Sequence, residues 1–204
     1  MAGTGHFSRP PQNDPIRRSS AARTLVKSGP MTQTSTTHSN ASVLTGRRAD
    51  ALADRLEQGA KALADFAASL TDAQWKTRCV PDGRTIGVIV HHVGFVYPIE
   101  IDISRPLATG EPLTGVTMDD VHAMNAKHAI DYAAATKEQA IELVRTNSAA
   151  AAAAIRALSD DQLAQAAPAS LYGDAPVTCQ FILEDHAVRH SYHHLARLKR
   201  AVSA

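Results

Sequence analysis

The chain has 204 residues, of which 44% are hydrophobic, 20% charged and 4% aromatic, which suits one soluble domain with residues left over for a tail. Its 21 basic and 20 acidic side chains give a net charge of +1, which excludes a strongly basic nucleic-acid-binding protein, so we expect no nucleic-acid partner. The chain also contains ten histidines. Because histidine commonly binds metals or transfers protons near neutral pH, the positions of these ten bear most directly on function.

Residues 1–42 are expected to form a disordered basic tail. They hold few large apolar side chains and many Ser, Thr, Pro, Gly, Asn and Gln, so they bury too little surface to offset the entropy of ordering. The tail carries five cations and one acid, whereas residues 43–204 carry sixteen cations and nineteen acids. Met31 is an alternative start, in which case residues 1–30 belong to an over-extended reading frame. We therefore place the folded domain at residues 43–204.

The domain begins with two predicted helices. Apolar residues recur at steps of three, four and seven (Leu52, Leu56, Leu63, Phe66 and Leu70), which predicts a first helix over about 44–70. A Pro-Asp-Gly turn follows, after which Thr85 can cap a second helix that runs from Ile86 to about Leu107. We expect Pro98 to kink this second helix.

Two further helices follow a connector that contains Pro and Gly. Thr117 or Asp119 begins a third helix. Thr136 and Gln139 have the spacing of a capping box, so another helix begins there and continues through a run of six alanines to Leu158.

The last predicted helix begins near Pro176, which suits a first-turn position, and reaches about Ala201. No segment shows the alternating pattern of a strand. The predicted fold class is therefore all-α, a compact four-helix bundle in which the third long helix is broken or extended by a short one, with a disordered N-terminal tail.

The cysteines and the apolar runs bear on localisation. Cys79 and Cys179 form no Cys-x-x-Cys pair, which is typical of free thiols in a reducing compartment. The strongest apolar run, Ile86–Val90, is too short to cross a bilayer, and the N-terminus lacks the apolar region of a secretory signal. We expect a cytoplasmic protein without a membrane partner.

The histidines of the domain gather on the second and last predicted helices. At about 100° per residue, His186 and His190 lie one turn apart on one face, the spacing by which a single helix supplies two metal ligands. A third ligand must come from another element. The apolar stripe of the second helix places His92 at its inward edge and His91 on the outside. The pattern predicts a divalent metal held by His92, His186 and His190.

Other polar residues are candidates for roles near this predicted metal site. His193 and Asn125 are the candidate catalytic residues, expected near the substrate. Asn125 and His122 are three residues apart and can face the interior together, with a pair on the helix surface as the alternative. Glu100 lies eight residues after His92, about 12 Å farther along the helix, so we expect it outside the ligand set.

Two motifs resemble a known family. The segment Thr85–Val93 resembles the second-helix motif of the DinB-like (damage-inducible) four-helix-bundle superfamily, in which a Ser or Thr cap is followed seven residues later by a histidine, here His92. The segment Ile182–His193 resembles the last-helix motif, a His-x-x-x-His pair with a polar residue three positions on. The resemblance covers about residues 44–201.

The resemblance implies an up-down-down-up bundle, a divalent metal on His92, His186 and His190, and frequent homodimers. Characterised relatives include thiol-dependent transferases and isomerases that use mycothiol or bacillithiol. The sequence departs from the family at Arg84, where a tryptophan commonly precedes the cap. The related mycothiol-dependent maleylpyruvate isomerases carry a glutamate where His186 stands.

Three imidazoles that leave coordination positions open can polarise an oxygen or sulfur ligand and lower its pKa. We therefore predict a thiol-dependent S-transferase or metal-assisted hydrolase that acts on a small molecule. A mycothiol-dependent isomerase is one alternative, and a non-catalytic, stress-related binding or scaffold bundle is another. Zinc or nickel is the expected metal, iron and copper are compatible with the same ligands, and a low-molecular-weight thiol is a candidate cosubstrate.

Overall fold

The structure is a computed structural model, and it describes residues 47–203. The predicted tail at 1–42 and the first four residues of the predicted domain lie outside the described residues. The predicted domain boundary at residue 43 therefore stays a prediction.

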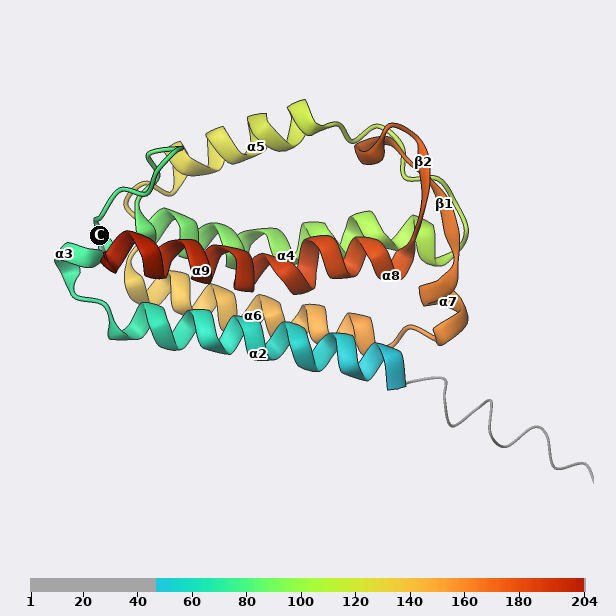
Figure 1. Ribbon diagram of the computed structural model, residues 1–204, viewed down its shortest axis with the longest axis horizontal. Helices are drawn as coiled ribbons and strands as arrows, with labels where there is room; N and C mark the ends of the chain where they lie inside the picture. The colour runs from blue at the N-terminus through green and yellow to red at the C-terminus, as the bar shows by residue number, and fades with distance from the viewer. Residues whose placement is uncertain (1–46, 204) are drawn as a thin grey trace, which may run out of the picture. The chain divides into compact units, whose positions relative to one another are not determined.

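Four long helical stretches form the bundle. They are α2 (Arg47–Ser69), α4 (Ile86–Ala108), α6 (Lys137–Arg156) and a last stretch that joins α8 (Cys179–Ile182), the π-helical η2 (Leu183–Val188) and α9 (Arg189–Ser203). Helix α4 packs against α6, and α2 packs against α6 and α9. Figure 1 shows that α2 and α9 run in one direction while α4 and α6 run in the other. The predicted all-α bundle with up-down-down-up order is thereby confirmed.

Helix α5 (Met118–Asp131) makes this order possible, because it returns the chain to the end of the bundle at which α4 began (Figure 1). The side chain of Thr117 caps α5 by accepting a hydrogen bond from the Asp120 backbone N–H. Thr136 and Gln139 form the predicted capping box at the start of α6. Both helix starts lie within one residue of the positions expected from the sequence.

A small hairpin precedes the last helical stretch. Strands β1 (Ala166–Ala169) and β2 (Ala175–Thr178) pair antiparallel, follow the short α7 (Asp160–Ala164), and flank η1 (Ser170–Tyr172). The prediction that Pro176 lies in the first turn of the last helix is wrong, because Pro176 pairs with Pro168 in the hairpin. Both strands of a two-stranded sheet are edges, where proline is tolerated. Thr178 caps α8 instead.

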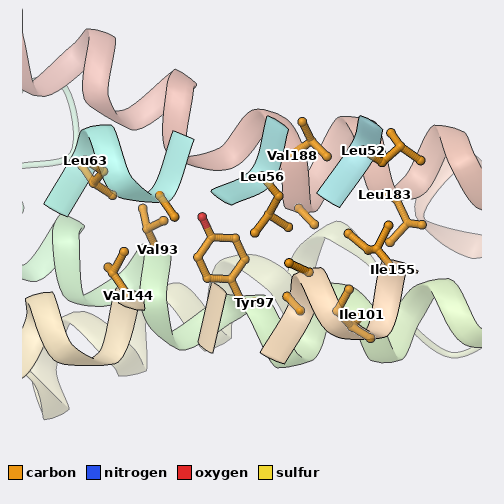
Figure 2. Close-up of a cluster of buried hydrophobic side chains, with 14 of the residues drawn as sticks. Leu52, Leu56, Leu63, Val93, Tyr97, Ile101, Val144, Ile155, Leu183 and Val188 are labelled. Atoms are coloured by element: carbon orange, nitrogen blue, oxygen red, sulfur yellow. The ribbon is translucent and has the colours of Figure 1, made fainter. Parts of the chain in front are cut away.

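The core lies between the four long stretches, and Figure 2 shows a part of it. Leucines of α2 meet Val93, Tyr97 and Ile101 of α4 and Val144 of α6 in this cluster. Tyr97 is fully buried, and its hydroxyl hydrogen-bonds the Ser191 hydroxyl of α9. Helix α4 continues through Pro98, so the expected kink does not divide it.

Helix α4 is the one helix among residues 47–203 that is long and apolar enough to cross a membrane. In the bundle, 72% of its apolar window is buried against other parts of the chain. Its apolar character is therefore accounted for by its place in the core.

Candidate metal centre

Three histidine side chains converge between α4 and α9. His92 Nε2 lies 3.2 Å from His190 Nε2, and one ring nitrogen of each of His92, His190 and His194 lies within 4.8 Å of the other two. His92 and His194 are buried, and His190 is half-buried. Imidazole nitrogens bind zinc at about 2.0–2.1 Å, so the nitrogens of one site lie within about 4 Å of one another. The three rings are close to the spacing that a single metal ion requires.

Burial disfavours the protonated form of two rings of this cluster, His92 and His194. Burial lowers the pKa of His92, and the neighbouring His190 and His194 rings lower it further. Burial also lowers the pKa of His194. The Nδ1 atoms of His92 and His194 are buried without a hydrogen-bond partner among residues 48–203. Each unsatisfied buried group costs about 1–3 kcal/mol, so these rings are costly to bury without a function. Three imidazole nitrogens within 4.8 Å of one another are a donor set that a divalent cation such as zinc takes, so the residues present fit a metal site.

Glu100 of α4 holds the third ring in place. Its Oε1 lies 2.5 Å from His190 Nδ1, and the side chain is almost fully buried. A carboxylate that accepts the Nδ1–H fixes the tautomer in which Nε2 carries the lone pair. Glu100 lies outside the group of three histidines, as expected from its distance along α4. It still contacts one of them, because His190 reaches across from α9 and contacts both His92 and Glu100.

His186 lies outside this group of three. Its Nε2 is 3.1 Å from the Tyr172 hydroxyl, and its ring stands half-buried one helical turn before His190. The structure thus brings together two of the three predicted ligands, His92 and His190, and adds His194. The role of His186 as the third ligand stays a prediction.

A cavity of about 300 Å³ opens beside the cluster, between α4, α5 and the hairpin. Four polar side chains at or near the histidine cluster line this cavity: His92, Glu100, His186 and His190. Most other lining side chains are apolar and come from α4, α5 and the segments that flank them: Val96, Ile99, Ile103, Val116, Met118, Val121, Met124 and Leu171. Apolar walls with a few convergent polar groups are typical of small-molecule sites.

The two candidate catalytic residues are placed differently. Asn125 of α5 lines the cavity, and its Oδ1 is buried without a hydrogen-bond partner in the described part of the chain. His193 is exposed, does not line the cavity, and packs its ring edge-on against His194. His122 is exposed on α5. The geometry therefore keeps Asn125 within reach of a substrate and places His193 on the surface.

His91 is buried, and the expectation that it faces outward is wrong. Its Nδ1 lies 2.9 Å from His128 Nε2, and its ring stacks on Tyr132 at 4.2 Å between centroids. Both partners belong to α5 and its C-terminal cap. Helix α5 therefore covers the face of α4 that the periodicity assigns to solvent.

A sequence model of the DinB superfamily matches residues 55–198, a range that spans all three clustered histidines. The chain belongs to the DinB superfamily. The resemblance seen in the two helical motifs is thereby confirmed. No match was found among curated proteins.

Among solved structures, this DinB-superfamily chain is similar to YfiT from Bacillus subtilis, described as a probable metal-dependent hydrolase with an unusual four-helix bundle topology. The sequences are 21% identical, the TM-score is 0.61, and the match covers 75% of this chain and 85% of that chain. At this identity the likeness shows a shared fold.

His194 is the residue of the candidate metal centre that the sequence did not single out. A signal was present, because His190 and His194 are spaced four apart just as His186 and His190 are. A projection at 100° per residue treats the whole segment as one α-helix. The π-helical turn at Leu183–Val188 changes the register between His186 and α9, so the projection does not apply across it.

Proposed function

We propose that this protein is a metal-dependent hydrolase of small molecules, with the metal held by His92, His190 and His194. One observation carries the proposal: three imidazoles converge beside a largely apolar cavity of about 300 Å³. The description of YfiT as a probable metal-dependent hydrolase supports the same class of reaction. A divalent ion there would polarise a carbonyl oxygen and lower the pKa of a coordinated water.

The chain itself supplies orientation and an apolar binding surface. Glu100 holds His190 in the tautomer that a metal requires, and the apolar walls favour a substrate with an apolar body. Asn125, with its unpartnered Oδ1 at the cavity, can accept a hydrogen bond from the polar end of the substrate. We therefore expect short apolar esters or amides to be better substrates than highly charged molecules.

Zinc or nickel remains the expected metal, with iron and copper compatible. A coordination position on the metal that no protein side chain occupies would also accept a low-molecular-weight thiol. An S-transferase and a mycothiol-dependent isomerase therefore remain alternative proposals. The largely apolar walls of the cavity favour hydrolysis of a substrate with an apolar body over binding of a large polar thiol. We also propose a cytoplasmic location, on the basis of the sequence, and a homodimer, on the basis of the family resemblance.

Metal content measured on purified wild type and on single alanine variants tests the site. We expect one metal per chain in wild type and loss of that metal in His92→Ala, His190→Ala and His194→Ala. His186→Ala distinguishes the two ligand sets, since it should retain the metal if His194 is the third ligand. His193→Ala is the matched control, because it removes an exposed imidazole next to His194. A wild type that takes up neither zinc nor nickel contradicts the proposal.

Turnover of nitrophenyl esters and anilides of straight-chain acids tests the chemistry. We expect hydrolysis that is abolished by a chelator and restored by the metal. Rates measured with and without added thiols separate hydrolysis from thiol transfer. Metal-loaded protein without turnover in either arm supports the non-catalytic binding or scaffold alternative.

A further inference from the structure

The cavity beside the histidines is long and narrow. Its lining residues on α4 run along one face from His92 to Ile103, which is about 16 Å of helix axis. Its lining residues on α5 begin at Met118 and end at Asn125, so α5 borders the cavity over about two turns. A volume of about 300 Å³ spread over this length forms a slot and excludes a wide chamber. The slot suits a ligand that is extended.

The two ends of the slot differ in chemistry. Three polar side chains border the end nearest the metal centre: His92, His190 and Asn125. Figure 1 shows that the start of α5 and the hairpin lie at the end of the bundle where α4 ends. Three apolar side chains from these elements border that far end: Ile103 of α4, Val116 before α5 and Leu171 of η1. A ligand with a polar head and an apolar tail therefore fits the slot in one orientation.

Other polar side chains of the slot are engaged by the chain itself. One oxygen of Glu100 lies 2.5 Å from His190 Nδ1, and His186 Nε2 lies 3.1 Å from the Tyr172 hydroxyl. The carboxylate of Asp120 accepts hydrogen bonds at the start of α5. The surface that remains for the tail of a ligand is mostly apolar.

Hydrogen bonds between two connecting segments hold the apolar end in place. Ser170 Oγ accepts a hydrogen bond from the Val116 N–H at 3.3 Å and donates one to the Val116 carbonyl oxygen at 2.7 Å. Leu113 N–H donates to the Pro168 carbonyl oxygen at 3.0 Å, and the Leu113 carbonyl oxygen accepts from Ser170 N–H at 2.9 Å. Val116 and Leu171 both pack against the core. The far end of the slot is therefore a fixed wall.

The distance from the metal centre to this wall is set by one helix, because α4 carries both His92 and Ile103. A cavity of about 300 Å³ holds about ten groups of the size of a water molecule, at about 30 Å³ each. A methylene group is of similar size. Each methylene group that moves from water to an apolar wall improves binding by about three- to fourfold. This gain ends where the chain meets the wall.

We propose that the substrate of this site is an ester or amide with one straight alkyl chain of about six to eight carbons, and that Ile103, Val116 and Leu171 limit the length of that chain. The inference rests on the proposed function. Hydrolysis adds water across the bond between the carbonyl carbon and the leaving group, so a carboxylic acid and an alcohol or amine are released. The identity of the third metal ligand does not affect the inference, because His92 and His190 border the slot in either case.

Two series of esters with increasing chain length test the inference: nitrophenyl esters of straight-chain acids, and acetate esters of straight-chain alcohols. In wild type we expect kcat/KM to rise about three- to fourfold per methylene in one series, up to about eight carbons, and to fall beyond that length. The series that shows the rise identifies whether the chain belongs to the acid or to the alcohol. Ile103→Phe should lower kcat/KM for the eight-carbon ester by about 10-fold or more and leave the shortest ester within a few-fold of wild type.

Ile130→Phe is the matched control, because it makes the same change at a side chain of α5 that is 77% exposed. It should leave the dependence on chain length unchanged. Leu171→Ala is a second variant, which keeps the test valid if Ile103→Phe does not fold, and it should move the optimum to longer chains. Calorimetric binding of straight-chain carboxylic acids to metal-loaded protein needs no turnover and should show the same limit on chain length.

Three results would overturn the inference, and they are distinguishable. Folded Ile103→Phe and Leu171→Ala with the chain-length dependence of wild type show that this wall does not limit the chain, while ester hydrolysis leaves the proposed function intact. Branched or cyclic acids that bind more tightly than straight-chain acids with the same number of carbons show that the slot does not select an extended chain. Acids that bind according to length, without hydrolysis of any ester or anilide, overturn the proposed function and the substrate assignment with it.

Discussion

The carboxylate of Glu100 determines how His190 presents its ring to a metal. It is buried and lies 2.5 Å from Nδ1, while its second oxygen has no hydrogen-bond partner within the described chain. A buried carboxylate is costly unless a charge or a hydrogen bond compensates it. A cation bound next to His190 would supply that compensation through the ring. The residue thus links the stability of the site to its occupancy.

We predict that Glu100→Gln weakens metal binding by about 10-fold to 100-fold, the usual cost of losing a partner that orients a ligand. The amide keeps the size of the side chain and removes the carboxylate that accepts the Nδ1–H of the His190 ring. Competition against a chromogenic chelator measures the change in Kd. Asp102→Asn is the matched control, because Asp102 lies on the same helix but is exposed and pairs with Arg105. Equal affinities for Glu100→Gln and wild type would show that the carboxylate has no part in the site.

The packing of α4 on α6 depends on a close approach at Gly94. A Cβ atom built at Gly94 would lie 2.8 Å from the backbone nitrogen of Val144 and 2.9 Å from the carbonyl carbon of Leu143. Asn147 Nδ2 donates to the Gly94 carbonyl oxygen at 2.8 Å and fixes the same contact from α6. Since α4 carries His92 two residues earlier, this contact also sets the position of the site relative to the bundle.

We predict that Gly94→Ala lowers the free energy of unfolding by about 2 kcal/mol. Overpacking against backbone costs up to about 3 kcal/mol, and the better helix propensity of alanine returns about 1 kcal/mol. Gly59→Ala is the contrasting control, because its close neighbour is the half-exposed Tyr192 ring, which can move aside. Urea unfolding of both variants should show a loss for Gly94→Ala and little or none for Gly59→Ala. Similar free energies of unfolding for the two variants would mean that α4 and α6 can move apart at Gly94 without a loss of stability.

At the scale of the whole molecule, local signals predicted most of the fold. Caps at Thr85, Thr117 and Thr136 act within three residues, so the sequence alone locates the helices they begin. The β1–β2 hairpin escaped prediction because its strands are four residues long, rich in Ala and Pro, and stabilised by each other. The residues of either strand alone do not indicate that the two strands pair.

The candidate site was predictable to the extent that each ligand belongs to one helix. His92 and His190 followed from helix periodicity and from the family motifs. The choice between His186 and His194 depends on the π-helical turn, and the burial of His91 depends on where α5 lies. The contact between Glu100 and His190 joins two helices. Each of these features depends on how two elements are placed relative to each other, and the spacing of residues within one helix does not determine that placement.

The buried histidines make the stability of the whole bundle sensitive to acid. Burial lowers the pKa of His128 to about 4, and burial lowers the pKa of His91, its hydrogen-bond partner. In the unfolded chain these imidazoles bind protons below about pH 6.5, whereas in the folded chain His128 binds its proton only near pH 4. The free energy of unfolding therefore falls as the pH falls through this window. His128 is 2% exposed, and it alone accounts for about 2 kcal/mol between pH 7.5 and pH 5.

We therefore predict that metal-free protein loses about 2 kcal/mol or more of its free energy of unfolding when the pH is lowered from 7.5 to 5.0. Urea titrations in the presence of a chelator measure the loss, and the chosen window ends above the range in which most carboxylates bind protons. His128→Asn should reduce the loss, because the asparagine has no proton to gain, whereas His122→Asn at an exposed position of α5 should not. Equal free energies at the two pH values would show that the interior accepts charged imidazoles, which would also weaken the case for a cluster of neutral metal ligands.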